Sequence, residues 1–397
     1  MSLFTRKYLW RYSKLSSISK AFSTADTVKI PFLTGLSLEF HTIWLRHHCP
    51  CENCFNPKTF QKMVIPSKLP DLSVIKDVET NSSLNSVQIT WMDDHKSTFD
   101  MNWLQKVNTK WLKIPENYFL KEDDDQYKYN FTNIHPFPSD PLQNAVNYDD
   151  FMSSDHSLAE LLGNIVKHGF GIVQNAPPDF NSTKEVVLRI SHPQNTIYGD
   201  FSQWTSNLAH ADTAYTSEYV HLHTDTSYFS EPMGLQMFHC LKHEGTGGMN
   251  SLVDGFAIVK KFHENFPGEH SLLKKVFIPS QFLDVGKHHF YTADVTFKYS
   301  LLTRSIERFR YNPHDMATLD TIPFNLIAPF YTSLVRLSDE VESSPVWVKL
   351  SPGVVIFLDN WRVLHGRSEF TGFRHLCGAY IGRSDWLSKA RVLGVVK

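Results

Sequence analysis

The sequence has little that suits a membrane, a nucleic acid or an oxidising compartment. No apolar run in its 397 residues approaches the ~20 residues that a bilayer-spanning helix needs. Its 39 basic and 41 acidic residues leave a formal net charge of −2, so no excess charge attracts nucleic acid or a membrane surface. The five cysteines are odd in number, and three of them lie close together. This pattern favours a reducing compartment and a metal site over a disulfide framework.

The first 25 residues also lack acidic side chains, because the first one in the chain is Asp26. The segment has several lysines, arginines and serines, and its apolar residues recur at helical spacing with Arg11 interrupting the stripe. These features are typical of a mitochondrial presequence; a disordered basic tail is the alternative. We therefore predict a presequence at 1–27 and a mature protein in the mitochondrial matrix.

The stretch His223-Thr-Asp225, followed far downstream by His365, carries the strongest functional signal. Side chains two residues apart on a β-strand leave the same face, and a third ligand from a distant strand can close a triangle around a metal ion. Two histidines and one carboxylate form the iron(II) site of oxygenases that leave positions open for a co-substrate and O2. The spacing alone is weak evidence, since His210-Ala-Asp212 repeats it and a hydrogen-bonded polar pair at a strand end is the plain alternative.

Arg374 follows His365 and opens a strand-like segment. A 2-oxo acid that chelates iron through its keto oxygen and one carboxylate leaves a second carboxylate free, and a guanidinium binds such a group bidentately. Arg374, Leu376 and Tyr380 share one face at a period of two. We expect this face to carry an anion anchor at one end and an aromatic ring at the other.

A second metal site is predicted near the N-terminus. Cys49, Cys51 and Cys54 supply three thiolates within six residues. The segments 87–91 and 97–101 read as the strands of a hairpin whose turn carries His95. His95 would complete a tetrahedral Cys3His zinc site, with His47 and His48 as competitors for the fourth position.

From about residue 40 onward the chain resembles the carnitine-biosynthesis dioxygenases, which are the trimethyllysine and γ-butyrobetaine dioxygenases and depend on iron(II) and 2-oxoglutarate. The matching runs are Trp44-Leu-Arg-His-His-Cys49-Pro-Cys51-Glu-Asn-Cys54, Ala214-Tyr215-Thr, His223-Thr-Asp225, His239-Cys-Leu-Lys-His-Glu-Gly-Thr-Gly-Gly248, Val253-Asp-Gly-Phe256 and Asp359-Asn-Trp-Arg-Val-Leu-His365-Gly-Arg. The γ-butyrobetaine enzymes have a histidine where this chain has His95. The resemblance therefore supports His95 as the fourth zinc ligand.

The resemblance implies a mainly β fold with helices, in which a double-stranded β-helix, or jelly roll, follows a small zinc-binding β module. We expect the module at 28–115, a polar and acidic linker at 116–150, and the oxygenase domain at 151–397. Iron would bind His223, Asp225 and His365, while 2-oxoglutarate would contact Arg374 and Asn250. The resemblance also implies O2 as second co-substrate, ascorbate as reductant, structural zinc and a homodimer.

Aromatic residues should select the substrate, because a quaternary ammonium donates no hydrogen bond and is held by ring faces. By resemblance, Tyr198, Tyr215 and Tyr380 occupy positions of such a cage. The tryptophan that the family adds falls here on Ser202. Trp204, two residues further along, is the candidate that fills its place.

Asp212 distinguishes the two members of the family. Trimethyllysine has an α-ammonium where γ-butyrobetaine has only a carboxylate, so an acid pairs with the first substrate and repels the second. The butyrobetaine enzymes carry an amide at this position and the trimethyllysine enzymes an acid. We therefore expect a trimethyllysine 3-hydroxylase, with Asn312 as a further substrate contact. The Cys-Pro-Cys-x-x-Cys run favours the alternative, γ-butyrobetaine hydroxylation; a non-catalytic betaine-binding relative is a third possibility.

Overall fold

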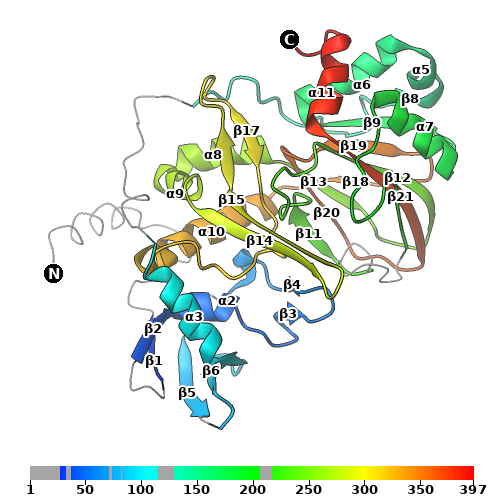
Figure 1. Cartoon of the computed structure of the whole chain (residues 1–397). Helices are drawn as coiled ribbons and strands as arrows, with labels where there is room; N and C mark the ends of the chain where they lie inside the picture. Colours follow the sequence, from blue (N-terminus) through cyan, green and yellow to red (C-terminus); the bar gives the residue numbers. More distant parts are fainter. Residues whose placement is uncertain (1–26, 33–36, 71–73, 82, 115–128, 206–216) are drawn as a thin grey trace.

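Two facing β-sheets form the centre of the molecule in the computed structural model, which describes residues 27–32, 37–70, 74–81, 83–114, 129–205 and 217–397 (Figure 1). The larger sheet has, in spatial order, β10 (Ser202–Trp204), β21 (Phe373–Ile381), β12 (Leu235–Glu244), β19 (Val355–Asp359), β9 (Phe170–Gln174) and β8 (Val146–Asn147). The smaller sheet has β11 (Val220–His223), β20 (Val363–Arg367), β13 (Asn250–Asp254) and β18 (Val346–Val348). Neighbouring strands are antiparallel except for the parallel pair β8 and β9. No helix among these residues is long and apolar enough to cross a bilayer.

A buried apolar layer fills the space between the two sheets. It contains side chains from both sheets, among them Phe170, Ile172, Leu252, Val348, Ile356, Leu358, Val363 and Leu376. Burial of this layer is the main force that holds the sheets face to face. The predicted double-stranded β-helix, a mainly β fold with helices, is confirmed.

Four helices cover the outer face of the larger sheet: α5 (Tyr148–Ser153), α6 (Asp155–His168), α7 (Phe180–Ile190) and α11 (Arg383–Val392). The sequence sets both ends of α6. The Ser154 hydroxyl caps its N-terminus by accepting hydrogen bonds from the first-turn N–H groups, and Gly169 ends it in a left-handed conformation with φ +83°. The apolar residues Leu158, Leu161, Leu162 and Ile165 then form one buried stripe that faces the sheet.

A long insertion between β13 and β18 covers the outer face of the smaller sheet. Its elements are α8 (Gly255–Asn265), α9 (Pro267–Leu273), β14 (Phe277–Asp284), β15 (His288–Val295), β16 (Phe297–Tyr299), β17 (Ile306–Phe309), η3 (Phe324–Leu326) and α10 (Ile327–Glu342). Leu222, Val253 and Leu364 point from the smaller sheet into the same core as Phe262 and Phe330 of this insertion. The insertion therefore fixes the back of the smaller sheet.

The N-terminal residues fold beside this insertion (Figure 1). Their elements are β1 (Thr27–Pro31), β2 (Ser37–His41), α2 (Thr42–His47), β3 (Phe55–Asn56), β4 (Gln61–Lys62), η1 (Pro66–Lys68), β5 (Ile75–Asn81), β6 (Ser86–Trp91), β7 (Lys96–Asp100) and α3 (Met101–Trp111). The predicted hairpin is present as β6 and β7. The apolar residues of the module share one continuous core with the insertion, and Trp44 donates its indole N–H to the Leu319 carbonyl at 3.0 Å. The predicted module is therefore joined to the catalytic part through a common apolar interior.

We expected a linker at 116–150. Its first part, up to residue 128, lies outside the described residues. Its second part packs on the catalytic sheets. Val146 and Asn147 pair with β9 as strand β8, and Phe137 lies edge-on to Phe170 with ring centroids 5.1 Å apart. Apolar residues in this polar stretch explain the difference, because Phe137, Ala145 and Val146 pack in or against the buried clusters of the sheets.

Candidate functional site

His223 and His365 lie directly opposite each other in the smaller sheet. His223 ends β11, His365 lies on β20, and the two residues are register partners whose ring centroids are 4.5 Å apart. We expected the third ligand to come from a distant strand, and β20 is distant from β11 only along the chain. β11 and β20 are distant in sequence but adjacent in the same sheet.

Asp225 does not lie on the strand, in contrast to the prediction. β11 ends at His223, and Asp225 begins a turn in which Thr226 has φ +54°. The side chain of Asn360 braces this turn: its Oδ1 accepts from the Asp225 N–H at 2.7 Å, and its Nδ2 donates to the Asp225 and Met233 carbonyls at 3.1 and 3.0 Å. Asn360 is a site residue that we did not predict. Its place in the run that ends at His365 was the available signal.

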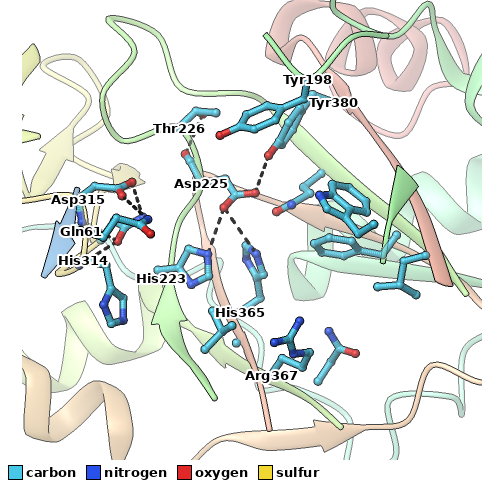
Figure 2. A pocket seen from close by; sticks show the side chains of 18 of the residues that line it. Gln61, Tyr198, His223, Asp225, Thr226, His314, Asp315, His365, Arg367 and Tyr380 are labelled. Atoms are coloured by element: carbon cyan, nitrogen blue, oxygen red, sulfur yellow. Dashed lines mark hydrogen bonds and ion pairs between the residues drawn. The ribbon is translucent and has the colours of Figure 1, made fainter. Parts of the chain in front are cut away.

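Three potential ligand atoms converge in this arrangement (Figure 2). Asp225 Oδ1 is 3.1 Å from His223 Nε2 and 3.8 Å from His365 Nε2. The Nδ1–H of His223 donates to the His221 carbonyl at 2.7 Å, so Nε2 is the ring nitrogen that faces the shared space and would bind a metal after losing its proton. Tyr380 donates its hydroxyl proton to Asp225 Oδ2 at 2.8 Å. The donor set fits a divalent transition metal of the non-haem iron class.

The ionisation of these groups reflects their proximity. Burial disfavours the charged form of His223, but its hydrogen bond to Asp225 outweighs this effect and raises the pKa of the imidazole to about 9. Burial, together with the charge of His223, lowers the pKa of His365 to about 3. Burial also opposes ionisation of Asp225, yet the two histidines and Tyr380 lower the pKa of its carboxyl to about 2. Asp225 is therefore available as an anionic ligand.

Arg374 lies in the same pocket and is buried. Its Nη2 donates to Asn250 Oδ1 at 3.2 Å, while its Nε has no hydrogen-bond partner among the described residues. Burial lowers the pKa of the guanidinium to about 10, so it remains charged at neutral pH. A buried guanidinium beside an amide, and not beside a carboxylate, suits an anionic ligand. Arg367, which we did not predict, lines the pocket as well and donates to the Glu218 carbonyl.

The aromatic residues expected to select the substrate line another part of the pocket. Tyr198 and Tyr380 have ring centroids 6.5 Å apart, and Trp204 lines the pocket while packing on Phe238. Tyr228, which was not expected in the cage, places its hydroxyl 3.0 Å from that of Tyr198.

Of the remaining predicted substrate contacts, Asn312 lines the pocket. Its Nδ2 donates to Asp315 Oδ2 at 2.7 Å, and its Oδ1 accepts from the backbone N–H of His314. Its amide thus already braces a loop of the pocket wall. Asp212 and Tyr215 lie outside the described residues.

The second predicted cluster also comes together. His95 Nε2 is 3.2, 3.5 and 3.6 Å from the sulfur atoms of Cys49, Cys51 and Cys54. The competing histidines have other partners: the ring of His47 contacts the Tyr331 hydroxyl, and His48 uses both ring nitrogens on backbone groups. These atoms fit a four-coordinate Cys3His zinc site.

The thiols of this cluster do not ionise equally: the hydrogen bond to Cys49, together with burial, raises the pKa of Cys54 well above its usual value. A hydrogen bond from Cys54 outweighs burial and lowers the pKa of Cys49 to about 4. Thiolates are the form in which cysteine binds zinc.

Comparison with known proteins identifies the family. A family model described as "Taurine catabolism dioxygenase TauD, TfdA family" matches residues 133–380. The chain belongs to this dioxygenase family. A second model, described as "Gamma-butyrobetaine hydroxylase-like, N-terminal", matches residues 20–105. The predicted enzyme class, a dioxygenase and hence an oxidoreductase, is confirmed.

Relatives that align over most of this chain show which enzymes of the family it is similar to. The chain is 34% identical over 400 residues to "Trimethyllysine dioxygenase, mitochondrial" of Mus musculus, with 99% of this chain and 92% of the relative covered. The protein of the same name from Homo sapiens is 37% identical, with 97% and 90% covered. "Gamma-butyrobetaine dioxygenase" of Pongo abelii is 28% identical, with 89% and 91% covered. The predicted resemblance is confirmed, and the relatives of higher identity carry the trimethyllysine name.

Proposed function

We propose that this TauD-family dioxygenase hydroxylates N6,N6,N6-trimethyllysine at C3, the first step of carnitine biosynthesis, using iron(II), 2-oxoglutarate and O2, with ascorbate as reductant. The observation that carries the proposal is that the ligand atoms of His223, Asp225 and His365 share one pocket with the buried guanidinium of Arg374. The relatives named trimethyllysine dioxygenase support the substrate.

His223, Asp225 and His365 would hold the iron, which together with 2-oxoglutarate and O2 supplies an oxidant strong enough for an unactivated C–H bond. The protein's own part is positioning. Arg374 and Asn250 bind the distant carboxylate of 2-oxoglutarate and so orient its chelating end. Tyr380 holds Asp225 Oδ2 and leaves Oδ1 for the iron. The buried walls of the pocket exclude bulk water.

Aromatic faces hold the trimethylammonium group of the substrate. Tyr198, Tyr380 and Tyr215 serve this purpose in our proposal, and Trp204 adds a fourth ring. An ammonium without N–H groups gains cation–π attraction from each ring face. Asp212 and Asn312 contact the amino-acid end.

Side-by-side turnover tests the substrate. Purified protein with iron(II), 2-oxoglutarate and ascorbate is given trimethyllysine or γ-butyrobetaine, and succinate and hydroxylated product are measured. We expect preference for trimethyllysine. Asp212→Asn should weaken trimethyllysine turnover and relax the exclusion of γ-butyrobetaine, because it removes one charge contact and one repulsion. Preference of the wild-type protein for γ-butyrobetaine would replace the proposal with that alternative.

We further propose that the protein acts as a homodimer in the mitochondrial matrix and that its Cys3His cluster binds zinc. The mitochondrial names of the animal relatives and the basic first 25 residues support the location. Light scattering of the purified protein measures its oligomeric state. Fractionation of mitochondria that contain the tagged protein measures its location.

A further inference from the structure

The pocket has a polar wall that the proposed iron, 2-oxoglutarate and ring contacts do not use. Asp315 is buried and lines the pocket together with His223 and Tyr198. Its Oδ1 accepts a hydrogen bond from Gln61 Nε2 at 2.9 Å, and its Oδ2 accepts from Asn312 Nδ2 at 2.7 Å. In Figure 2, Gln61 and Asp315 lie on the side of His223 and Asp225 opposite Tyr198 and Tyr380.

Gln61 belongs to the N-terminal module and not to the oxygenase sheets. It lies on β4, which follows the loop that carries Cys49, Cys51 and Cys54. We call this loop the cysteine loop. Two backbone contacts fix β4 on the pocket wall: the Lys62 N–H donates to the His314 carbonyl at 2.9 Å, and His314 Nδ1 donates to the Lys62 carbonyl at 2.7 Å. The Met63 N–H donates to the Cys54 carbonyl at 2.9 Å. A connected set of hydrogen bonds thus runs from the cysteine loop to the carboxylate of Asp315.

The wall is also close to the predicted iron ligands. Ser227, two residues after Asp225, points its hydroxyl at Asp315 Oδ2 at 3.5 Å. Asp315 lines the same pocket as the predicted ligands His223, Asp225 and His365. A group bound at Asp315 would therefore lie near the predicted metal and opposite the aromatic rings.

We propose that Asp315 is a subsite for the α-ammonium of an amino-acid substrate and that Gln61 positions its carboxylate from the N-terminal module. This inference rests on the proposed function. The substrate has two cations of different chemistry. The trimethylammonium has no N–H and suits ring faces, whereas the α-ammonium has three donors and suits a buried carboxylate.

The position of the reacting carbon agrees with this subsite. C3 of the substrate is bonded to the α-carbon, so the α-ammonium must lie within a few bonds of the carbon that reacts. Asp315 meets this requirement because it lies beside the turn that carries Asp225. An ammonium has three N–H donors, so a contact with Asp315 does not exclude the contact proposed above for Asp212.

Two substrates and three variants test the subsite. Wild type, Asp315→Asn, Gln61→Leu and the control Asp284→Asn are compared on trimethyllysine and on 6-(trimethylammonio)hexanoate, which lacks only the α-amino group. Asp284 is paired with Lys287 at 3.1 Å and does not line the pocket. KM and kcat come from product formation, and melting temperature and zinc content report on folding.

We expect Asp315→Asn to raise KM for trimethyllysine roughly tenfold or more through loss of a charge-assisted contact, with KM for the des-amino substrate and for 2-oxoglutarate unchanged. Gln61→Leu should act in the same direction and more weakly, with zinc content unchanged, and Asp284→Asn should match wild type. Equal losses on both betaines in Asp315→Asn would show that Asp315 only braces its loop. If Asp315→Asn does not fold, Gln61→Leu decides the question: a raised KM for trimethyllysine with an unchanged KM for the des-amino substrate supports the subsite, and equal changes in both contradict it. A wild-type protein that does not turn over trimethyllysine would overturn the proposed function and the subsite together.

Discussion

Tyr380 donates its hydroxyl proton to Asp225 Oδ2, and this bond decides which carboxylate oxygen faces the two histidines. The His221 carbonyl has the same effect on His223, because it accepts the Nδ1 proton and leaves Nε2 available. At the scale of single residues, hydrogen bonds thus orient the predicted ligand atoms toward the shared space.

Replacing Asp225 by Ala should abolish iron-dependent decarboxylation of 2-oxoglutarate. The change removes the only carboxylate of the predicted ligand set, and with it the charge balance of the site. Succinate formation is the measurement, with circular dichroism to show that the fold is retained. Turnover equal to wild type would rule out the predicted iron site.

Replacing Arg374 by Ala should raise KM for 2-oxoglutarate far more than KM for trimethyllysine. The carboxylate of the co-substrate would lose its buried partner, a cost of about 2–5 kcal/mol. Steady-state kinetics in both substrates measure the effect. Arg189→Ala is the matched control, because Arg189 makes an ion pair with the exposed Asp155 and neither residue lines the pocket. Equal changes in both KM values would make Arg374 a structural residue.

At the scale of elements, the turn after β11 depends on the turn between β19 and β20. Asn360 bridges them with three hydrogen bonds to backbone groups and is almost completely buried, with 2% of its surface exposed. These bonds add to those within the Asp225 turn, where the Thr226 hydroxyl donates to the Asp225 carbonyl at 2.8 Å. The element that supplies His365 therefore also places the carboxylate ligand.

Asn360→Ala should destabilise the protein by about 2–4 kcal/mol, because it leaves buried backbone groups without partners. It should also weaken iron binding, by roughly 10–100-fold if Asn360 acts as a ligand-orienting residue. Thermal unfolding and metal titration measure the two effects. Unchanged iron affinity in a destabilised variant would limit Asn360 to a structural role.

At the scale of the whole molecule, the N-terminal module and the insertion share one apolar core. Trp44 and Phe40 of the module belong to the same buried cluster as Phe330 and Tyr331 of α10. A change that destabilises the module should therefore also destabilise the catalytic part. The hydrogen bonds from β4 to the pocket wall provide one route.

His95→Ala should lower the zinc content from about one per chain and reduce the melting temperature of the whole protein. The shared core predicts one cooperative unfolding transition and not the loss of the module alone. Elemental analysis and calorimetry measure these outcomes. His156→Ala, at an exposed position on α6, should change neither. Absence of zinc in the wild-type protein, with stability unaffected by chelators, would exclude the site.

The sequence by itself determined the features that depend on local pattern. The period of two in Val87, Ile89 and Trp91 predicted β6. Residue type and spacing suggested both metal clusters, and the family resemblance was needed to choose His365 and His95 as their distant members.

Only the tertiary structure decided where these pieces meet. β11 pairs with β20 in an arrangement that buries both faces of the smaller sheet. The local sequence of neither strand specifies which strand it pairs with. The turn at Asp225 is braced by Asn360, which satisfies its backbone groups from a distant part of the chain. The contact of Gln61 with Asp315 likewise depends on a core shared across the chain. Long-range packing and hydrogen bonding set these positions, since they satisfy buried groups that no neighbour in sequence can reach.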